Sequence, residues 1–285
     1  MKKVRKAVVL IAGMGTRFLP ITKTCPKEML PIIDKPIIHF IVEEIIESGI
    51  EEILFITSSY KKVIEDYFDQ SYELESRLEK SGKTEQLKMV QDISTMANIY
   101  YVRQGEPLGT GHAVNLARSF VGDEPFALLY ADNLVKGEVP AMKQLIETYE
   151  KYDCNVIGVQ EVPADTIHLY GIMDYCDENS LKIKRMVEKP EVGSVKSTSA
   201  ALGRYILKPE IFDEIGKIEM KNGEYCLTGA METLMEKQDF YSCILDGAWY
   251  DTGNQTGYLK ANIAYAFDDP KMKEQLLEFI SEIDK

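Results

Sequence analysis

The 285-residue sequence lacks several features that mark common classes of protein. Its 33 lysines and arginines are outnumbered by 46 aspartates and glutamates, so the formal net charge is −13. A nucleic acid or an anionic membrane needs a broad basic surface on its partner, so this composition argues against both partners. A few local cations can still hold a small anionic substrate. No apolar run is long enough to span a bilayer, so no membrane segment is predicted.

Cysteine is scarce, and no pattern of reactive residues indicates covalent catalysis. The five cysteines are scattered, odd in number and without C-x-x-C spacing. This usage predicts reduced thiols in a cytoplasmic protein rather than a disulfide framework or a zinc site. No Ser-His-Asp or Cys-His arrangement is readable, so a covalent nucleophile is not indicated. Internal repeats, low-complexity segments and linkers are also missing, and one continuous domain is expected.

The first half of the chain alternates strand-like and helix-like segments. Residues 1–13 (MKKVRKAVVLIAG) are basic and then apolar, like a secretory signal, but the short apolar run leads straight into GMGTR, which favours a first strand. The remaining patterns predict strands at 52–57, 98–104 and 126–132, and helices at 36–49, 61–68, 72–96, 111–121 and 139–152. This alternation is typical of right-handed βαβ units in a mostly parallel sheet.

The second half changes character. Strand-like segments with few helices between them occur at 154–162, 170–175, 182–189 and 197–207. They predict an antiparallel or mixed extension of the sheet. Helices are expected at 209–215 and 227–236, a strand at 240–245, and two final helices within 255–284 that are broken near Asp269-Pro270.

Three segments with polar residues are expected at one edge of the sheet. They are GMGTR after the first strand, QGEPLGTGH after the strand at 98–104, and Asp132-Asn133 after the apolar run FALLYA. Ligands of open α/β sheets bind at the carboxyl ends of the parallel strands. The sequence therefore predicts a binding site where these three segments converge.

The segment GMGTRFLP indicates a phosphate site. It matches neither common template, because a dinucleotide fingerprint needs glycine in place of Phe18 and a P-loop closes with Gly-Lys-Ser/Thr. Gly13 and Gly15 allow a tight turn whose N–H groups can approach an anion, and Arg17 and Lys27 supply two cations. A surface loop with incidental charge is the alternative. Two cations so close together in an acidic chain favour the phosphate site.

The other segments allow more than one interpretation. Gln104, Gly109 and Gly111 precede a helix and could contact a base or a phosphate, or the glycines could serve only the turn. Asp132 and Asp251 could hold a cation together with substrate phosphates, or each could cap the following turn, and their spacing does not say whether they meet. The segment VEKP could bind a sugar hydroxyl and a phosphate, or present an exposed Glu-Lys pair.

Taken in order along nearly the whole chain, these segments resemble a known family. The resemblance rests on the segments GMGTRFLPITKTCPKEMLPIIDKPIIHFIVEE, EPLGTGHAV, VIGVQEVP, YGIMD, VEKP and GRYILKPEIF. The family is that of the bacterial UTP–glucose-1-phosphate uridylyltransferases. The resemblance implies an α/β, single-domain, Rossmann-like nucleotide-diphospho-sugar transferase fold with a mostly parallel mixed central sheet and a helical C-terminal tail. It divides residues 1–285 into a nucleotide-binding part near 1–135, a sugar-phosphate-binding part near 136–253 and terminal helices near 254–285.

The resemblance also implies an activity and a setting. The activity is Mg²⁺-dependent synthesis of UDP-glucose and pyrophosphate from UTP and α-D-glucose 1-phosphate (EC 2.7.7.9 type). The setting is a homodimer or homotetramer in the bacterial cytoplasm, with no nucleic-acid or membrane partner, which supplies cell-envelope or capsular glycan synthesis.

Site residues follow from the resemblance by position. The nucleotide pocket is assigned to Leu10, Ala12, Gly13, Gly15, Gln104 and Gly109, of which the last two would contact the uracil. Arg17 and Lys27 would bind the triphosphate, and Asp132 and Asp251 would hold Mg²⁺. The glucose is assigned to Gly171, Glu188 and Gly203, and its phosphate to Lys189. The catalytic set would be Arg17, Lys27, Asp132 and Lys189.

The chain departs from the family pattern in four places. LIAG replaces PAAG, which is expected to put Ile11 beside the base pocket, and Asp132-Asn133 replaces Asp-Asp but retains the first, metal-binding position. GEYCLTGA replaces GEIQLTDA, so Cys226 and Gly229 stand near the sugar side, and AWYDTGN is equally similar to thymidylyltransferases. Uracil versus thymine and glucose versus another hexose therefore stay open. Two alternatives are a thymidylyl- or other-sugar transferase and a non-catalytic sugar-nucleotide-binding paralogue.

Overall fold

The apolar run at residues 7–10 forms an inner strand of the main sheet. The computed structural model describes residues 1–177, 180–220 and 223–283. In it, β1 (Lys6–Leu10) pairs in parallel with β4 (Glu52–Thr57) on one side and β6 (Phe126–Tyr130) on the other. β5 (Asn98–Arg103) extends the parallel set beyond β4. The first four predicted strands are confirmed, the first of them as a strand rather than a signal segment.

The second half of the chain extends this sheet in the antiparallel sense. β11 (Ser199–Leu207) runs antiparallel to β6, β8 (Asn155–Glu161) and β9 (Gly171–Tyr175). β10 (Ile183–Glu188) pairs antiparallel with β9, and β12 (Phe240–Ile244) pairs in parallel with β8. The sheet order is β10-β9-β11-β6-β1-β4-β5, with β8 and β12 joined through β11. The predicted mixed sheet is confirmed.

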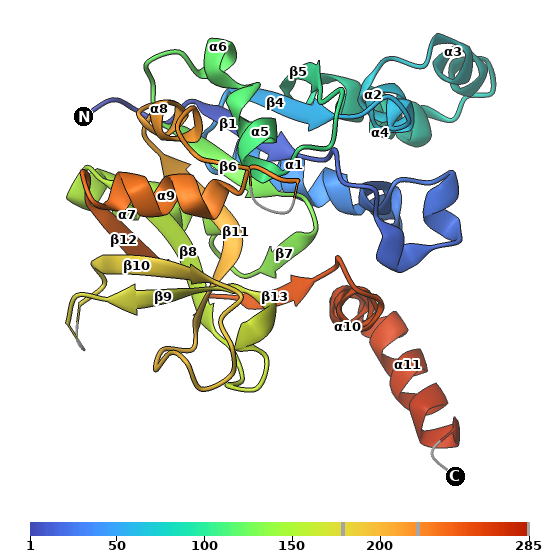
Figure 1. Cartoon of the computed structure of the whole chain (residues 1–285). Coiled ribbons are helices and arrows are strands. Elements are labelled where there is room, and N and C mark those ends of the chain that lie inside the picture. The colour runs from blue at the N-terminus through green and yellow to red at the C-terminus, as the bar shows by residue number, and fades with distance from the viewer. Residues whose placement is uncertain (178–179, 221–222, 284–285) are drawn as a thin grey trace.

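Helices cover both faces of the sheet (Figure 1). They are α1 (Ile37–Glu47), α2 (Lys62–Phe68), α3 (Tyr72–Lys80), α4 (Thr84–Thr95), α5 (Thr110–Asn115), α6 (Arg118–Val121), α7 (Ala141–Tyr152), α8 (Ile211–Ile215), α9 (Leu227–Met235), α10 (Gln255–Ala266) and α11 (Pro270–Ile283). One buried hydrophobic cluster joins the sheet to α1 and α7, and a second joins its other face to α5, α8 and α9. This layering, with the predicted terminal helices, confirms the α/β fold class.

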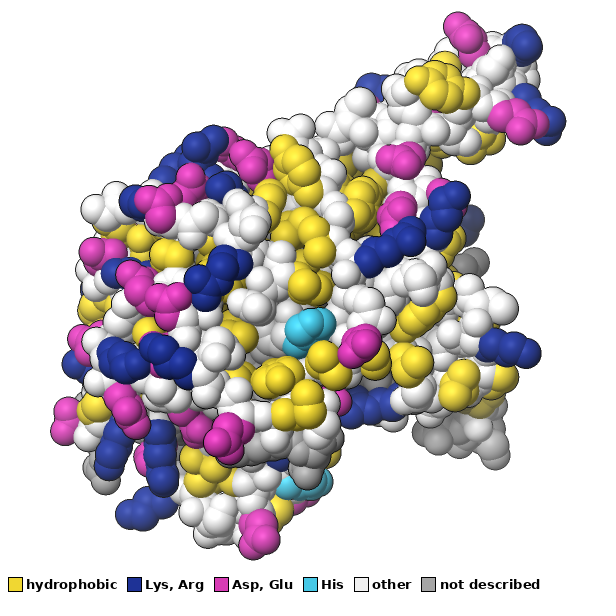
Figure 2. Space-filling view, turned by 45° about the horizontal axis from the view of Figure 1, so that its top comes forward, with side chains coloured by type: hydrophobic (Ala, Val, Ile, Leu, Met, Phe, Trp, Pro, Cys, Tyr) yellow, Lys and Arg dark blue, Asp and Glu magenta, His cyan; other side chains and the backbone are white. Residues whose placement is uncertain are grey.

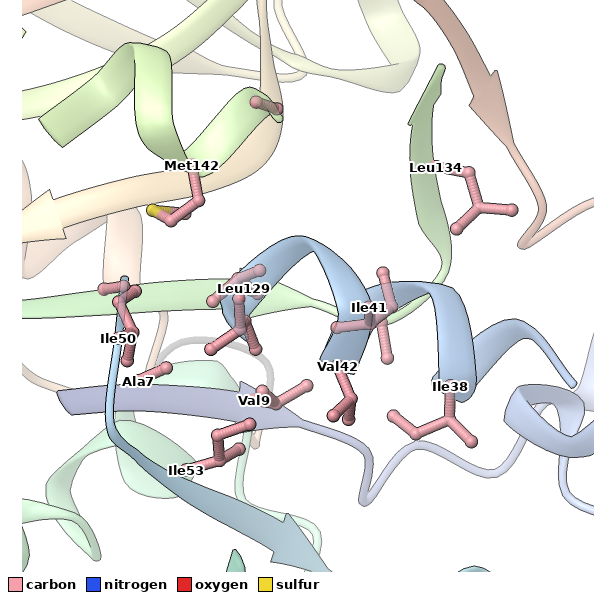
Figure 3. Packing of buried hydrophobic residues seen from close by; sticks show 14 of the residues in the cluster. Ala7, Val9, Ile38, Ile41, Val42, Ile50, Ile53, Leu129, Leu134 and Met142 are labelled. Atoms are coloured by element: carbon pink, nitrogen blue, oxygen red, sulfur yellow. The ribbon is translucent and has the colours of Figure 1, made fainter. Parts of the chain in front are cut away.

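Helix α1 shows how the sequence pattern builds the core. Ile38, Ile41, Val42 and Ile45 recur at helical spacing and are all 0% exposed. All four belong to one buried cluster with Ala7 and Val9 of β1, and Val42 lies near Val9 (Figure 3). Full burial of each such side chain contributes about 1.5–3 kcal/mol. The packing fixes β1, and with it the loop that follows β1.

Two predicted helices are wrong in extent. The segment 72–96 forms two helices, α3 and α4, because Gly82 adopts a φ of 68° that interrupts the first one. The segment 111–121 also forms two short helices, α5 and α6, with Leu116 and Ala117 between them. Neither of the helices α3 and α4 has a buried residue, and the pair extends from the edge of the molecule beside β5 (Figure 1).

A short two-stranded ribbon was not predicted. β7 (Asn133–Lys136) pairs antiparallel with β13 (Ala248–Asp251), in a register that places Asn133 opposite Asp251. A second small ribbon joins residues 31–32 to 35–36. After β13, α10 and α11 run away from the sheet (Figure 1). Among the described residues, no helix combines the length and apolarity needed to cross a membrane.

Candidate active site

A pocket of about 440 Å³ opens at the carboxyl ends of β1 and β6. Its walls come from the three segments that were predicted to converge, namely the loop after β1, the loop after β5 and the end of β6. The lining residues that the sequence had already singled out are Leu10, Ala12, Gly13, Lys27, Gln104, Gly109 and Asp132. On the face seen in Figure 2, hydrophobic side chains gather toward the centre, and acidic and basic side chains are interspersed around them.

Glycine is required at two positions of these loops. Gly15 has a φ of 65°, and a Cβ there would lie 3.2 Å from Cγ2 of Thr22 and 3.4 Å from Cβ of Lys27. Gly109 has a φ of 92°, and its Cβ would lie 2.8 Å from the carbonyl oxygen of Tyr225. Both positions combine a left-handed backbone with a close neighbour, so any side chain would be strained. The glycines thus allow the loop after β1 to close on Lys27 and the α5 loop to close on residue 225.

Gln104 is held by its own loop. Its Nε2 donates to the carbonyl oxygen of Gly109 at 3.2 Å and lies 3.0 Å from Nδ1 of His112. This arrangement makes His112 a positioning neighbour of Gln104. The same loop is anchored to the segment before α9, because the N–H of Gly111 donates to the carbonyl oxygen of Tyr225 at 2.8 Å.

Lys27 and Asp132 form an ion pair inside the pocket. Nζ of Lys27 lies 2.5 Å from Oδ2 of Asp132, with side chains 18% and 26% exposed. Burial alone would raise the pKa of Asp132, but the Lys27 ammonium holds it below its ordinary value. Burial would likewise lower the pKa of Lys27, but Asp132 and Glu28 raise it above its ordinary value. Both groups are therefore charged at neutral pH.

The β7–β13 ribbon brings the two predicted metal ligands together. A Cβ built on Gly253 would lie 2.8 Å from Oδ2 of Asp132 and 2.9 Å from Oδ1 of Asp251, so both oxygens face one point. Thr252, which is 0% exposed, ties the segments by donating to the carbonyl oxygen of Asp132 from both its N–H and its hydroxyl, each at 2.8 Å. Asn254 donates to Oδ2 of Asp251 at 2.9 Å.

The pair of carboxylates fits a divalent cation that also binds substrate. Two converging carboxylate oxygens are suitable ligands for a hard cation, which in nucleotide enzymes takes its other ligands from phosphates and water. Among the described residues, no group of three or more His, Cys, Asp or Glu side chains could hold a metal. Two protein carboxylates leave most ligand positions of such a cation to substrate phosphates and water.

The residues assigned to the sugar lie next to this pocket and outside its lining. A Cβ on Gly171 would lie 3.4 Å from Oε2 of Glu188, and that oxygen accepts a hydrogen bond from Thr228 at 2.9 Å. Gly203 has a φ of 66°, and its Cβ would lie 2.8 Å from Cβ of Tyr130, a lining residue. Strand β11 thus brings Gly203, one of the residues assigned to the sugar, against the lining of the pocket.

The two remaining cations point out to solvent. The side chain of Lys189 is 61% exposed, with a φ of 46° and an N–H that donates to the carbonyl oxygen of Tyr170 at 2.9 Å. Arg17 is exposed and, like Gly15, is outside the lining. The pKa of the Tyr170 phenol lies above its ordinary value: burial and the charge of Asp251 raise it, and the charge of Arg17 lowers it.

Sequence reasoning missed a buried ion pair behind Asp132. Arg204 is 0% exposed and donates to Glu44 of α1 through Nε at 2.9 Å and Nη2 at 2.8 Å. It also donates to the carbonyl oxygens of Tyr130 at 3.1 Å and Asn133 at 2.6 Å, which flank Asp132 in sequence. The motif GRYILKPEIF contained this arginine, but nothing in the sequence linked it to a glutamate 160 positions earlier.

The expectation for Ile11 is wrong. Ile11 is 1% exposed and packs in the cluster beneath α1, whereas Leu10 and Ala12 line the pocket. Successive side chains of an extended segment point to opposite faces, so the bulky residue faces the core. The departures Cys226 and Gly229 lie near the residues assigned to the sugar, because Thr228 of α9 donates to Glu188; Cys226 precedes α9, and a Cβ on Gly229 would meet no atom within 4 Å.

Comparison with known proteins then identifies the family. The profile of the nucleotidyl transferase family matches residues 6–267. The chain belongs to the nucleotidyl transferase family. Two curated relatives of this family are named UTP–glucose-1-phosphate uridylyltransferase. That of Staphylococcus haemolyticus is 48% identical over 99% of both chains, and that of Bacillus subtilis is 47% identical over 98% of this chain and 97% of its own.

Solved structures of nucleotidyl transferases agree with the fold. A UDP-glucose pyrophosphorylase from Acinetobacter baumannii is 36% identical, covers 98% of this chain and 99% of its own, and has a TM-score of 0.90. A UDP-glucose pyrophosphorylase complexed with UDP-glucose is 38% identical over 93% of this chain and all of its own, with a TM-score of 0.83. The pattern that was drawn from the sequence is confirmed at the level of family and fold.

Proposed function

We propose that this protein is a UTP–glucose-1-phosphate uridylyltransferase, which makes UDP-glucose and pyrophosphate from UTP and α-D-glucose 1-phosphate. The main support for this proposal is the similarity over the full length to relatives of that name, which are 46–48% identical. A UTP-bound relative 36% identical, with a TM-score of 0.89, supports the nucleotide. The pocket at the ends of β1 and β6 provides a site of suitable size.

The reaction needs positioning and charge rather than acid–base chemistry. An ionised phosphate oxygen of glucose 1-phosphate forms a bond to the α-phosphorus of UTP, and the bond from that phosphorus to the β-phosphate bridging oxygen breaks, so pyrophosphate leaves with the electron pair. Because the nucleophile is already an anion at neutral pH, no general base is required. The protein must bring two anions together, align them and neutralise the departing charge.

The residues of the site divide this work. Lys27 faces the pocket and, with Arg17 at its rim, binds the triphosphate. Lys189, on the sugar side, holds the phosphate of glucose 1-phosphate. Asp132 and Asp251 hold Mg²⁺, which when bound neutralises phosphate charge. In the structure Lys27 pairs with Asp132, so the lysine keeps this carboxylate compensated and lies within reach of the triphosphate.

Recognition of the two organic groups falls to glycines and hydrogen-bonding side chains. Leu10, Ala12, Gly13 and Gly15 form the wall and turn that hold the nucleotide. Gln104 and Gly109 contact the uracil, with the amide of Gln104 held by its own loop. The glucose contacts are Gly171 of β9, Glu188 of β10 and Gly203 of β11. This assignment makes residues 1–135 the nucleotide part and 136–253 the sugar-phosphate part.

The setting completes the proposal. The five cysteines are all unpaired, in keeping with the reducing bacterial cytoplasm. Helix α11 has no buried residue and exposes Leu277, Phe279, Ile280 and Ile283. Such a face favours a homodimer or homotetramer over a monomer.

A substrate panel tests the proposal. Pyrophosphate release is measured with glucose 1-phosphate and each of UTP, dTTP, GTP and ATP, with Asp132→Ala as the inactive control. UTP is expected to give the highest kcat/KM, and the purine nucleotides should fail because their bases need more room. A preference for dTTP would move the protein to the thymidylyltransferases, and no turnover with any nucleotide would refute the catalytic assignment.

A further inference from the structure

A row of hydrogen bonds on the β7–β13 ribbon ends on Asp132. The indole Nε1–H of Trp249 donates to Oδ1 of Asn133 at 2.8 Å, and Nδ2 of Asn133 donates to Oδ1 of Asp132 at 3.1 Å. Asn133 stands opposite Asp251 in the ribbon, and Trp249 stands two residues before Asp251. Since side chains alternate along a strand, Asn133, Trp249 and Asp251 share one face of the ribbon.

The direction of these bonds follows from the groups at the two ends. An indole N–H can only donate, and an ionised carboxylate can only accept. The indole therefore holds the amide oxygen of Asn133 toward Trp249 and directs the NH₂ group toward Asp132. Gly203, with its φ of 66°, leaves room for this group, because a Cβ there would lie 3.2 Å from Nδ2 of Asn133.

The amide of Asn133 determines which oxygen of Asp132 faces the rest of the site. With Oδ1 engaged by Asn133, Oδ2 is the oxygen that lies 2.5 Å from Nζ of Lys27 and faces the same point as Asp251. An aspartate at position 133 could not make this contact, since it has no donor. Asn133, where this chain departs from the Asp-Asp pattern, thus depends on Trp249 for the orientation of its amide.

We propose that Asn133 and Trp249 are positioning residues for the reaction, which together hold the Asp132 carboxylate in the orientation that serves the metal–nucleotide complex. This inference rests on the proposed function. Neither residue acts on the reacting atoms; each acts through Asp132. The same indole packs edge-on against Tyr170, with ring centres 5.3 Å apart, and the carbonyl oxygen of Tyr170 accepts from the N–H of Lys189. Trp249 therefore contacts the segments that carry both ends of the site.

Kinetics of three variants test the inference. Trp249→Phe removes the indole donor and keeps a ring against Tyr170, Asn133→Ala removes the amide, and the third variant combines them. Each single change is expected to lower kcat and to raise the half-saturating Mg²⁺ concentration about 10-fold, with the KM for glucose 1-phosphate nearly unchanged. The double variant should be no worse than Asn133→Ala alone, because both changes act through one amide.

The fluorescence of Trp249 gives a readout that does not depend on activity. It is the only tryptophan in the chain. Asn133→Ala should shift its emission to longer wavelength, because the freed N–H is then solvated, and should reduce the emission change when Mg²⁺ and UTP are added. Tyr149→Phe is the control: it removes another partly buried donor, to the carbonyl oxygen of Lys2 at 3.0 Å, and should change none of these values.

The outcomes separate this inference from the proposed function. A wild-type protein without turnover refutes the proposed function. If the wild type is active and the kcat losses of the two single variants multiply in the double variant, the positioning role is refuted. Unchanged emission in Asn133→Ala, or an unchanged Mg²⁺ requirement in Trp249→Phe, would also overturn it. Trp249→Phe alone carries the test if Asn133→Ala does not fold.

Discussion

Replacing Glu44 by glutamine tests whether the buried ion pair supports both the fold and the site. Glu44 and Arg204 have side chains 9% and 0% exposed, and Glu44 also accepts from the N–H of Met142 at 3.1 Å. Glutamine keeps the size of the side chain but replaces one carboxylate oxygen by an NH₂ group. That group is a donor, so the guanidinium of Arg204 loses one of its acceptors and the negative charge. Removing one partner of a buried pair costs about 3–5 kcal/mol, so Tm should fall by roughly 10 °C.

Urea unfolding measures this change. Glu44→Gln should lower the transition midpoint with the slope unchanged, because the folded state stays compact. At temperatures well below Tm, kcat should still fall, since Arg204 holds the carbonyl oxygens on either side of Asp132. The matched control is Glu73→Gln, which removes a pair with Arg77 whose side chains are 80% and 77% exposed and should cost at most about 0.5 kcal/mol. A loss below about 1 kcal/mol for Glu44→Gln would refute the reasoning.

Three further predictions concern single side chains. Asp132→Ala should abolish turnover and leave a folded protein by thermal unfolding; near-normal rates at limiting Mg²⁺ would contradict the metal assignment. Arg17→Ala should mainly raise the KM for UTP and Lys189→Ala that for glucose 1-phosphate, each losing about 2–4 kcal/mol of transition-state stabilisation; the reverse pattern would overturn the substrate orientation. Burial would raise the pKa of Glu43, but a hydrogen bond from His39 helps to hold it below 4.5. The carboxylate of Glu43 therefore binds a proton at higher pH in the unfolded state than in the folded state, so the free energy of unfolding should fall as the pH drops through this range. Urea unfolding of Glu43→Gln should show a less steep fall with pH; the same slope in both proteins would contradict the lowered pKa.

Local sequence signals were sufficient for the sheet and for most of the pocket. The apolar run at 7–10 and the helical spacing in α1 identified buried elements whose burial the structure confirms. Because parallel strands place their carboxyl ends at one edge, the sequence alone predicts that the loops containing Gly13, Gln104 and Asp132 converge, and all three residues line the pocket. Strand alternation also contained the information that Leu10 and Ile11 face opposite sides, although the family comparison led to the wrong expectation for Ile11.

Long-range contacts could not be read in this way. Strands β7 and β13 have four residues each and mix polar with apolar side chains, so no periodic signal marks them. Their pairing is what brings Asp132 beside Asp251. The pair Glu44–Arg204 likewise depends on the packing of α1 against β11, which no local pattern describes.

The late position of β13 in the chain sets the order in which the protein becomes competent during its synthesis. Thr252 contacts Asp132 across 120 positions of sequence, so the ribosome must add most of a domain before the second carboxylate exists. Strands β1, β4, β5 and β6 can pair before then. A nascent or truncated chain that ends before residue 248 would thus contain the parallel strands and the glycine loops but, on the proposed assignment, could not turn over nucleotide. Activity therefore requires synthesis at least through β13.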